Sequence, residues 1–568
     1  MAQAECGQDE AEVDTKDAHD DAAATFCDHV RGILPSPLTL ENGYIWRGAG
    51  AEAEPVCAPI KAIAQAPPGT DADTVWIYQL QFLAADGRLR DCVVNARDVI
   101  VWPDRMVARL VDRGFHLAAE PRDVSAILRR MPSPPLHRAV ARHGWADEDR
   151  RHFVTPSGAV ITYTGDTVSS DDPPPIYVGT SRPAFTARGD VQGWIDNVAQ
   201  DGLLSTHGGL HAVAIAAVPP LLSLVDRPSF LMHLHGSDDL ARACRQIATS
   251  VWSPPGALEL SWSRPENELC DAVATTRDSL LILSGYSERH ADKMPALSRA
   301  LTERDAQTDG GRCAILSTGD ALGADQAVSG CANLIELDAR DWFAPDAPDA
   351  LAQAVSRYHG ALGVRIVEKL QWIQANRADK LQERMNASSG IKETMGMSGA
   401  SESEHFARAR SALESLRIAA VLLSSERALN LEKGHIKAAF QDSARAWAAR
   451  QRAGHKREDR ILIDLATRLH DRTDDRLADL HDDRARELLE GMDGWQDGEW
   501  IYLTKAGFEH LASEIDGATR TTLLRSLNAR ELLHPSGGRG NTYRMPSCIP
   551  GRPHVYRISR DIMGFAEG

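Results

Sequence analysis

The chain has 568 residues, too many for a single hydrophobic core, so its length predicts several domains. Hydrophobic residues make up 43% of the chain and charged residues 25%, the balance of a soluble globular protein. The formal net charge of -17 excludes a protein that coats nucleic acid with its whole surface. It leaves room for a basic site confined to one part of the chain.

The beginning of the chain and its cysteines indicate a cytoplasmic protein. Residues 1–28 are acidic and polar, unlike a secretory signal, and we expect them to form a disordered tail. The nine cysteines contain no CxxC pair and no zinc-type spacing, which is typical of reduced thiols. The longest apolar run, 210–225, is too short for a membrane span and contains Pro219 and Pro220. It predicts a buried helix, a turn and then a helix or strand, with no membrane association.

Four further regions follow the tail. Residues 29–180 are predicted to be β-rich, with hairpins around Asp86-Gly87 and Ser157-Gly158 and a helical stretch over 105–130. Residues 181–345 alternate helical patterns with five short apolar strands, which predicts an α/β layer with a mostly parallel sheet. Residues 346–488 have helical patterns, interrupted near 385–404. Residues 489–568 form a smaller mixed domain.

The segment "SFLMHLHGSDDLARACRQIATSVW", 229–252, has the layout of a phosphate-binding P-loop: a strand, a glycine, a polar turn and a helix. The pattern G-x-x-x-x-G-K-[ST] holds phosphates with backbone amides and a lysine, and magnesium with a hydroxyl. With Gly236 on the first glycine, the last three positions hold Ala241, Arg242 and Ala243. Arginine binds phosphate, but alanine cannot bind magnesium.

Asp238 and Asp239 fall where the phosphates of a nucleotide would lie, and their charges would repel it. A structural interpretation explains them: Ser237 is a good helix N-cap, and acids in the first turn complement the helix dipole. Leu240, Cys244, Ile247, Ala248 and Val251 then form one apolar stripe. Residual nucleotide binding is the alternative.

Two later strands also lack the chemistry of an ATPase. The strand in "RDSLLILSGYSE" resembles a Walker B strand, whose end carries acids for magnesium and water, but Ser284 and Gly285 stand there. The strand in "RCAILSTGD" ends in Ser317 and Thr318, where a polar sensor would face a γ-phosphate. His233 and His235 share one strand face, but two imidazoles without a third ligand predict no metal site.

The order of these strands resembles the domain-of-unknown-function 927 family of helicase-like P-loop ATPases from phages and integrative elements. The resemblance covers roughly residues 40 to 565 and extends to framework positions outside the strands. Those positions are Gly144, Trp145, Phe153, Val154, Pro156 and Trp194, with "LSTGD" and "HVYRIS". It implies an AAA+-like core and a DNA-processing context.

The departures from the family pattern fall on catalytic positions, namely Arg242, Ala243, Ser284 and Gly285. An arginine that the family carries in the strand after the sensor is also missing from "NLIELD". Because the nucleotide, metal and water-activating groups are lost together, the sequence predicts a pseudo-ATPase without catalytic residues. ATP and magnesium are expected only if the chain is active after all.

The C-terminal region reads as a winged helix rich in arginine, with a single acid, Glu531, between 520 and 560. Arginines on a helix and a wing are suited to contact with DNA phosphates. The alternative is that they pair with acids of the helical region. The candidate DNA-binding residues are Arg520, Arg525, Arg530, Arg539, Arg544, Arg552 and Arg557.

The expected fold is therefore α/β and multidomain, with a β-rich N-terminal domain, an AAA+-like P-loop αβα core, a helical lid and a C-terminal winged helix. The expected function is that of an inactive helicase-like protein of a mobile element, acting as a DNA-binding or scaffold subunit in a replication or defence complex. Its partners would be DNA, an active ATPase homologue, another replication or defence protein, or further copies of itself. One alternative is an active translocase that uses Arg242 with Asp278 or Glu288, and another is a protein adaptor without DNA binding.

Overall fold

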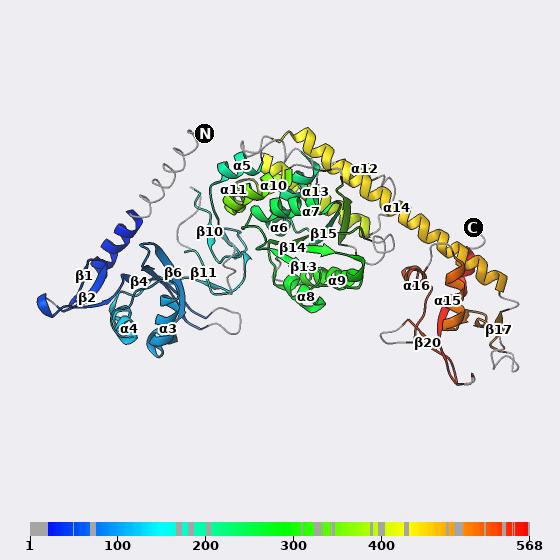
Figure 1. Cartoon of the computed structure of the whole chain (residues 1–568), viewed down its shortest axis with the longest axis horizontal. Helices are drawn as coiled ribbons and strands as arrows, with labels where there is room; N and C mark the ends of the chain where they lie inside the picture. The colour runs from blue at the N-terminus through cyan, green and yellow to red at the C-terminus, as the bar shows by residue number, and fades with distance from the viewer. Residues whose placement is uncertain are drawn as a thin grey trace. The chain divides into compact units, whose positions relative to one another are not determined.

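The structure is a computed structural model of the whole chain (Figure 1). It describes residues 21–565 except 49, 69–74, 166–172, 180–186, 200–205, 308–310, 323–330, 332, 341, 343–346, 387–389, 396–403, 425–430, 473–475, 482–491, 516–518, 537–540, 548 and 550. The chain divides into two compact units. One combines Met1–Thr186 with Val367–Arg377, and the other combines Ala187–Ile366 with Ala378–Gly568.

The first unit is built from small sheets and short helices. Its strands are β1 (Leu38–Glu41), β2 (Tyr44–Arg47), β3 (Glu54–Cys57), β4 (Ile60–Ala66), β5 (Ile77–Leu83), β6 (Leu89–Asn95), β7 (Ala139–Val140), β8 (Gly144–Trp145), β9 (His152–Val154), β10 (Val160–Thr162) and β11 (Ile176–Tyr177). The sheets are β1-β2-β3, β4-β5-β6, β10-β9-β8 and β11-β7. Both predicted hairpins are confirmed, since β5 pairs with β6 and β9 with β10 in antiparallel register, with Gly87 and Gly158 at positive φ in the turns.

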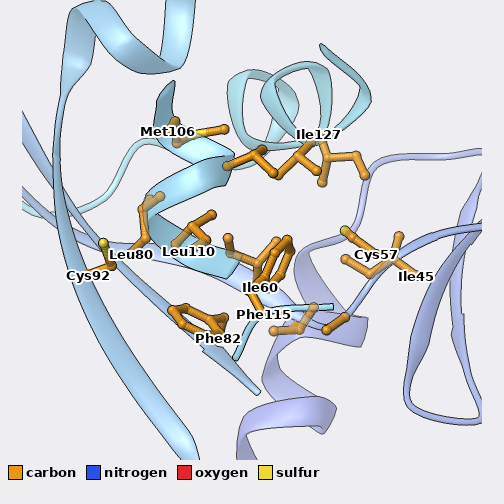
Figure 2. Close-up of a cluster of buried hydrophobic side chains, with 14 of the residues drawn as sticks. Ile45, Cys57, Ile60, Leu80, Phe82, Cys92, Met106, Leu110, Phe115 and Ile127 are labelled. Carbon is orange, nitrogen blue, oxygen red and sulfur yellow. The ribbon is translucent and has the colours of Figure 1, made fainter. Parts of the chain in front are cut away.

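The core of this unit lies between the sheet β4-β5-β6 and two helices, α3 (Pro103–Val111) and α4 (Pro121–Arg130) (Figure 2). Phe82 of β5 meets Phe115 edge to face, with ring centroids 5.3 Å apart. The helical stretch expected over 105–130 is two helices, because the chain turns between them at Gly114, which has a positive φ. A shorter helix, α2 (Ala96–Ile100), precedes them.

The disordered tail that the sequence predicted over residues 1–28 is wrong for residues 21–28. Residues 1–20 lie outside the described part, but residues 21–33 are helical. Phe26 and Val30 on this helix are buried in the same core as β4 and β5. The acidic composition predicted disorder. The structure differs because these two apolar side chains lie one helical turn apart, so both can pack into the core.

The second unit contains a five-stranded parallel sheet, as the sequence predicted. Its strands are β12 (Phe230–His235), β13 (Glu259–Ser261), β14 (Ser279–Tyr286), β15 (Cys313–Gly319) and β16 (Leu334–Asp338). The order is β13-β14-β15-β12-β16, with all neighbours parallel. Strand β15 therefore lies between β12 and β14, and the carboxyl ends of all five strands meet at one edge.

Helices cover both faces of this sheet (Figure 1). On one face α8 (Glu266–Thr275) and α9 (Met294–Asp305) pack against apolar side chains of β12, β14 and β15. Helices α6 (His207–Leu224) and α7 (Asp238–Ser250) pack against β15, and α6 also contacts α13 (Glu404–Ser424). Helix α5 (Val191–Val198) precedes α6 and begins at the N-cap Asp190.

The expected break at Pro219 and Pro220 is wrong, because α6 continues through both residues. A proline inside a helix costs about 3 kcal/mol. Leu221 and Leu222 that follow are almost fully buried, and burying one such side chain contributes about 1.5–3 kcal/mol. Among the described helices α6 is the one long and apolar enough to cross a membrane, and 83% of that window is buried inside the protein, as in a core helix.

The region after the sheet is helical, as expected. Its helices are α10 (Ala347–Arg357), α11 (Ala361–Asn386), α12 (Ile391–Thr394), α13 and α14 (Lys433–Arg472). The first part of α14 packs against α13 and β16. Farther along, Ile461, Leu465 and Leu469 of α14 belong to the core of the C-terminal elements.

The C-terminal elements form a five-stranded sheet with two helices on one face. The sheet has the order β17-β18-β19-β21-β20, from β17 (Leu477–Asp479), β18 (Gly494–Gln496), β19 (Trp500–Leu503), β20 (Tyr543–Arg544) and β21 (His554–Ser559). The helices are α15 (Lys505–Glu514) and α16 (Arg520–Ala529). Because β17 and the end of α14 contribute to this fold, it begins before residue 489, where the sequence placed the boundary.

Candidate functional site

The connection between β12 and α7 consists of Gly236 and Ser237 alone. The Ser237 hydroxyl accepts a hydrogen bond from the Leu240 backbone N–H at 3.4 Å, so the predicted N-cap is confirmed. Asp238 and Asp239 are exposed in the first turn of the helix. A P-loop holds phosphates with the backbone amides of a loop between strand and helix. Here Asp238 and the residues after it are helical, so only Gly236 and Ser237 lie between β12 and α7.

Arg242 and Ala243, which the sequence predicts at the P-loop lysine and threonine positions, are on different sides of α7. Arg242 is on the exposed side of α7, where it forms an ion pair with Asp239. Ala243 is fully buried on the apolar side of the helix, and Ala241 is buried as well. The predicted stripe from Leu240 to Val251 is buried too, so this side of α7 serves packing.

Ser284 and Gly285 lie in an irregular end of β14. The register with β15 shifts between Leu283 and Tyr286, and Gly285 is exposed with φ of 73°. The Ser284 carbonyl accepts a hydrogen bond from the Trp262 N–H at 3.0 Å. The residues that the sequence predicts at the position of the Walker B acids are therefore part of a bulge.

Ser317 and Thr318 end β15 with both side chains buried and engaged. The Ser317 hydroxyl accepts from Trp262 Nε1 at 3.0 Å and lies 2.8 Å from His233 Nδ1. Thr318 Oγ1 accepts from Arg245 of α7 at 2.8 Å. Both hydroxyls, which a sensor would direct at a γ-phosphate, are thus bound by the protein itself.

A buried ion pair lies on β16, the other neighbour of β12 in the sheet. Arg450 of α14 lies 3.0 Å from the Glu336 carboxylate and 3.0 Å from His235 Nε2, and it donates to the Leu322 carbonyl at 3.1 Å. Glu336 also accepts from the Leu322 N–H at 2.7 Å. Burial raises the pKa of Glu336 to about 7, although Arg450 opposes the shift.

The histidines of β12 are neutral, structural side chains in this arrangement. His233 Nε2 donates to the Asp320 carbonyl at 2.8 Å, which leaves Nδ1 to accept from Ser317. Burial lowers the pKa of His233 to about 3, and it lowers the pKa of His235 as well. Among the described residues no group of three or more His, Cys, Asp and Glu could hold a metal ion.

The two acids that an active enzyme would need lie at opposite ends of β14. Asp278 precedes β14 at its amino end, is buried, and accepts from the Arg312 backbone N–H at 3.0 Å. Glu288 is exposed in the 3-10 helix η3 (Glu288–Lys293). Asp278 is therefore at the edge of the sheet opposite to the connection between β12 and α7.

Several candidate arginines of the C-terminal elements are already paired. Arg520 lies 3.5 Å from Glu509, and Arg530 forms an ion pair with Asp459 of α14. Arg525 is half-buried, and one of its terminal nitrogens is buried without a hydrogen-bond partner. Arg539 lies outside the described residues. The alternative in which the arginines pair with acids of the helical region thus applies to Arg530.

The hairpin of β20 and β21 carries three candidate arginines that form no ion pair with a described acid. Arg544 and Arg552 are exposed, and Arg552 Nε donates to the Met545 carbonyl at 3.3 Å. Arg557 is stacked between Trp500 and Tyr543. The sequence analysis missed Trp500 and Tyr543, which come from two strands far apart in the chain.

Comparison with known proteins agrees with this fold. The solved structure described as "SCCmec type IV Cch - active helicase" is similar over 94% of this chain and 99% of its own, with a TM-score of 0.57 and 14% identity. At this identity the likeness concerns the fold, and the chain is a mixed α/β protein with a helicase-like fold. Residues 44–298 match the family model "Domain of unknown function (DUF927)".

The remaining comparisons add no argument. The structure described as "The A form apo structure of NrS-1 C terminal region-CTR" covers 56% of this chain and 72% of its own, at 9% identity and a TM-score of 0.25. A search of the curated proteins gives no match. The family match ends within α9, whereas the predicted resemblance extended to about residue 565, so beyond α9 the fold likeness alone supports it.

Proposed function

We propose that this protein is a helicase-like pseudo-ATPase that acts as a DNA-associated subunit without hydrolysing ATP. The observation that carries the proposal is the two-residue connection between β12 and α7, which leaves no loop to hold phosphates. A nucleotide needs several backbone amides directed at its phosphates, and here the Ser237 hydroxyl already accepts from the first turn of α7. The exposed acids Asp238 and Asp239 add repulsion.

The arrangement of the sheet supports descent from an ATPase core. Strand β15 lies between β12 and β14, the order that AAA+ ATPases have between their Walker A and Walker B strands. Helices α10 to α14 follow in the position of a lid, and the C-terminal sheet with α15 and α16 has the elements of a winged helix. These are proposed equivalences, and they assign the domain roles that the sequence predicted.

ATP and magnesium do not fit the residues that are present. A functional site needs a lysine or arginine directed at the phosphates, a hydroxyl for magnesium and two acids beside it. Arg242 is turned toward Asp239, Ala243 is buried, and Gly285 has no side chain. The side chains of Arg450 and Glu336 occupy the neighbouring strand end. No resident cofactor is therefore proposed.

The proposed context is a replication or defence complex of a mobile element, where the chain would work beside DNA and an active ATPase homologue. The fold likeness to a helicase described with the word SCCmec supports this context. The arginines on β20 and β21 that have no ion pair with described acids support contact with DNA. Assembly with further copies of the chain, or with an active homologue, is compatible with the fold of such motors.

The test is nucleotide binding and hydrolysis by the purified chain. We expect no phosphate release and no thermal stabilisation by ATP with magnesium, because a bound ligand at 100 times its Kd would stabilise the fold by about 2.7 kcal/mol. Arg242→Ala serves as the matched variant. Hydrolysis by the natural chain that disappears in Arg242→Ala would refute the proposal and favour an active translocase.

A further inference from the structure

We propose that the edge of the C-terminal sheet face turned away from α15 and α16 binds single-stranded DNA, with Arg557 holding a phosphate and Trp500 and Tyr543 contacting bases. The middle of that face is closed by a buried cluster of Trp495, Tyr502, Met545, Ile549 and Val555, so the proposed site is the partly exposed region beside this cluster. This inference rests on the DNA part of the proposed function. The inference places DNA binding on a strand surface instead of on the helix of a winged-helix domain, and it specifies single-stranded DNA as the ligand. The surface is called the Arg557 face and consists of Trp500, His534, Tyr543 and Arg557.

The strand register places these side chains on one face. Tyr502 is opposite Arg557 across β19 and β21, and Trp500 lies two residues before Tyr502. Tyr543 is opposite Val555, which lies two residues before Arg557. Directly opposed residues and residues two apart project to the same side of a sheet. The intervening residues Ile501, Leu503, Tyr556 and Ile558 are in the core formed with α15 and α16.

The side chains of the Arg557 face form a stacked ladder. The Arg557 guanidinium lies 4.6 Å from the Trp500 ring centroid and 4.2 Å from the Tyr543 ring centroid. His534 meets Trp500 edge to face with centroids 4.5 Å apart. All four side chains are half-buried, so the ladder is held in place while part of each group stays open to solvent. Such prior ordering reduces the entropy lost when a ligand binds.

Arg557 is the group in the ladder that points to an anion. Its Nε donates to the His534 carbonyl at 3.1 Å, and among the described residues neither terminal nitrogen has a hydrogen-bond or ion-pair partner. Arg530 differs, because Asp459 neutralises it, and Arg520 has Glu509. A fixed guanidinium with its terminal fork unpaired matches the oxygens of a phosphate.

The surroundings favour a polyanion. Arg544 and Arg552 are exposed on the hairpin of β20 and β21 and make no ion pair with described acids. The nearby acid Asp497 is already engaged, since it accepts from Tyr502 Oη at 2.8 Å and from the Trp500 N–H at 2.7 Å. In a chain of net charge -17, this group of cations is a local positive region, which is complementary to a nucleic-acid backbone.

Aromatic rings beside a phosphate-binding arginine indicate an unpaired strand. Bases in a duplex are stacked on one another and cannot reach Trp500 or Tyr543, whereas bases of a single strand can stack on such rings. A sheet face with aromatic side chains is a common platform for single-stranded nucleic acids. A protein ligand with acidic side chains would use the guanidinium but would not need the rings.

The experiment titrates the full-length protein with a fluorescein-labelled poly-dT oligonucleotide and with a duplex at two salt concentrations. The variants are Arg557→Gln, and Trp500→Leu with Tyr543→Leu, which keep the site apolar. The matched control is Arg530→Gln, an arginine of the same region that is paired with Asp459. Circular dichroism and the thermal midpoint of each variant separate loss of binding from loss of folding.

We expect Arg557→Gln to weaken binding of the single strand about tenfold and to reduce the slope of log K against log salt by about 1. The aromatic variant should lose about 5- to 100-fold at both salt concentrations, because stacking is not ionic. Arg530→Gln should change little. A preference for the duplex, no binding of poly-dT, or equal loss in Arg557→Gln and Arg530→Gln would each overturn the inference. The proposed lack of ATP hydrolysis is measured without DNA, so it survives or fails independently.

Discussion

Arg450 of α14 and Glu336 of β16 form an ion pair, with Nη2 3.0 Å from Oε1, at the carboxyl end of the parallel sheet. The Glu336 side chain is 1% exposed, so its carboxylate depends on Arg450 and on the Leu322 N–H for compensation. In working ATPases of related layout the strand ends face a nucleotide. In this protein a side chain of the helical region lies at one of them.

Arg450→Met should therefore destabilise the fold by about 1–3 kcal/mol, the loss typical of leaving a buried polar group without its partner, because Glu336 with a pKa of about 7 can take up a proton when the cation is removed. The double variant Arg450→Met with Glu336→Gln should recover a large part, because the carboxylate that needs the cation is then gone. Urea unfolding followed by tryptophan fluorescence measures both values. Arg445→Met is the matched control, since Arg445 pairs with Asp442 on the exposed side of the same helix and should cost under about 1 kcal/mol. Equal effects of the two single variants would contradict this role of Arg450.

Restoring the P-loop residues should not restore nucleotide binding. Ala243→Thr adds a hydroxyl and a methyl group to a fully buried position of α7, and overpacking of this kind costs about 1–3 kcal/mol. Arg242→Lys is exposed and should change stability by under about 0.5 kcal/mol. Calorimetric titration with ATP and magnesium should give no heat of binding for the double variant, because the connection between β12 and α7 is still two residues long. Measurable binding would show that side chains, rather than the missing loop, prevent it.

His233 should make the protein sensitive to acid. Its pKa falls from 6.5 to about 3 in the folded state, mainly because of burial, with smaller contributions from the neighbouring His235 and Arg450. Between these values the unfolded chain binds a proton that the folded chain does not, so the free energy of unfolding decreases as the pH falls below 6.5. The contribution is at most about 1.4 kcal/mol per pH unit.

The raised pKa of Glu336 acts in the opposite direction between pH 4.5 and about 7, because there the folded state holds the extra proton. The measurement is therefore made in a Glu336→Gln background, with and without His233→Gln. Urea unfolding at several pH values between 7 and 4.5 should give a steeper loss of stability when His233 is present. Parallel pH profiles of the two proteins would rule out this role of His233.

The sequence predicted those parts of the fold in which local pattern and tertiary environment agree. Each of the five strands of the parallel sheet is a short apolar run bounded by polar turns, and all five are in place. The prediction for helix α6 was wrong because local sequence rules end a helix at two consecutive prolines. In the structure the burial of the residues around Pro219 and Pro220 outweighs the free-energy cost of the prolines. Strand β17 was missed because three residues between helical patterns carry too weak a signal.

The candidate site could be predicted in part. Departures from the P-loop and Walker B patterns are visible in the sequence, because these patterns require particular residue types at particular positions. The ion pair of Arg450 and Glu336 is not visible there, since the two residues meet only after α14 has packed against β16. A signal existed in "NLIELD", where Glu336 occupies a position that strand alternation directs to the buried side with Leu334. The ladder around Arg557 likewise depends on strand register, which composition does not reveal.

Arg530 shows why the number of arginines overstates the DNA-binding surface. Its guanidinium pairs with Asp459 of α14 and lies 5.9 Å from the Phe565 ring centroid, so it joins two elements of the C-terminal fold. Both partners of the ion pair are exposed to a large extent, so Arg530→Ala should cost no more than about 1 kcal/mol in thermal or urea unfolding. Asp459→Asn should cause a similar loss of stability, and if DNA binding depends on free cations it should raise DNA affinity slightly by releasing Arg530. A fall in DNA affinity with Arg530→Ala as large as that with Arg557→Gln would mean that paired arginines also contact DNA, and that the basic surface extends onto α16.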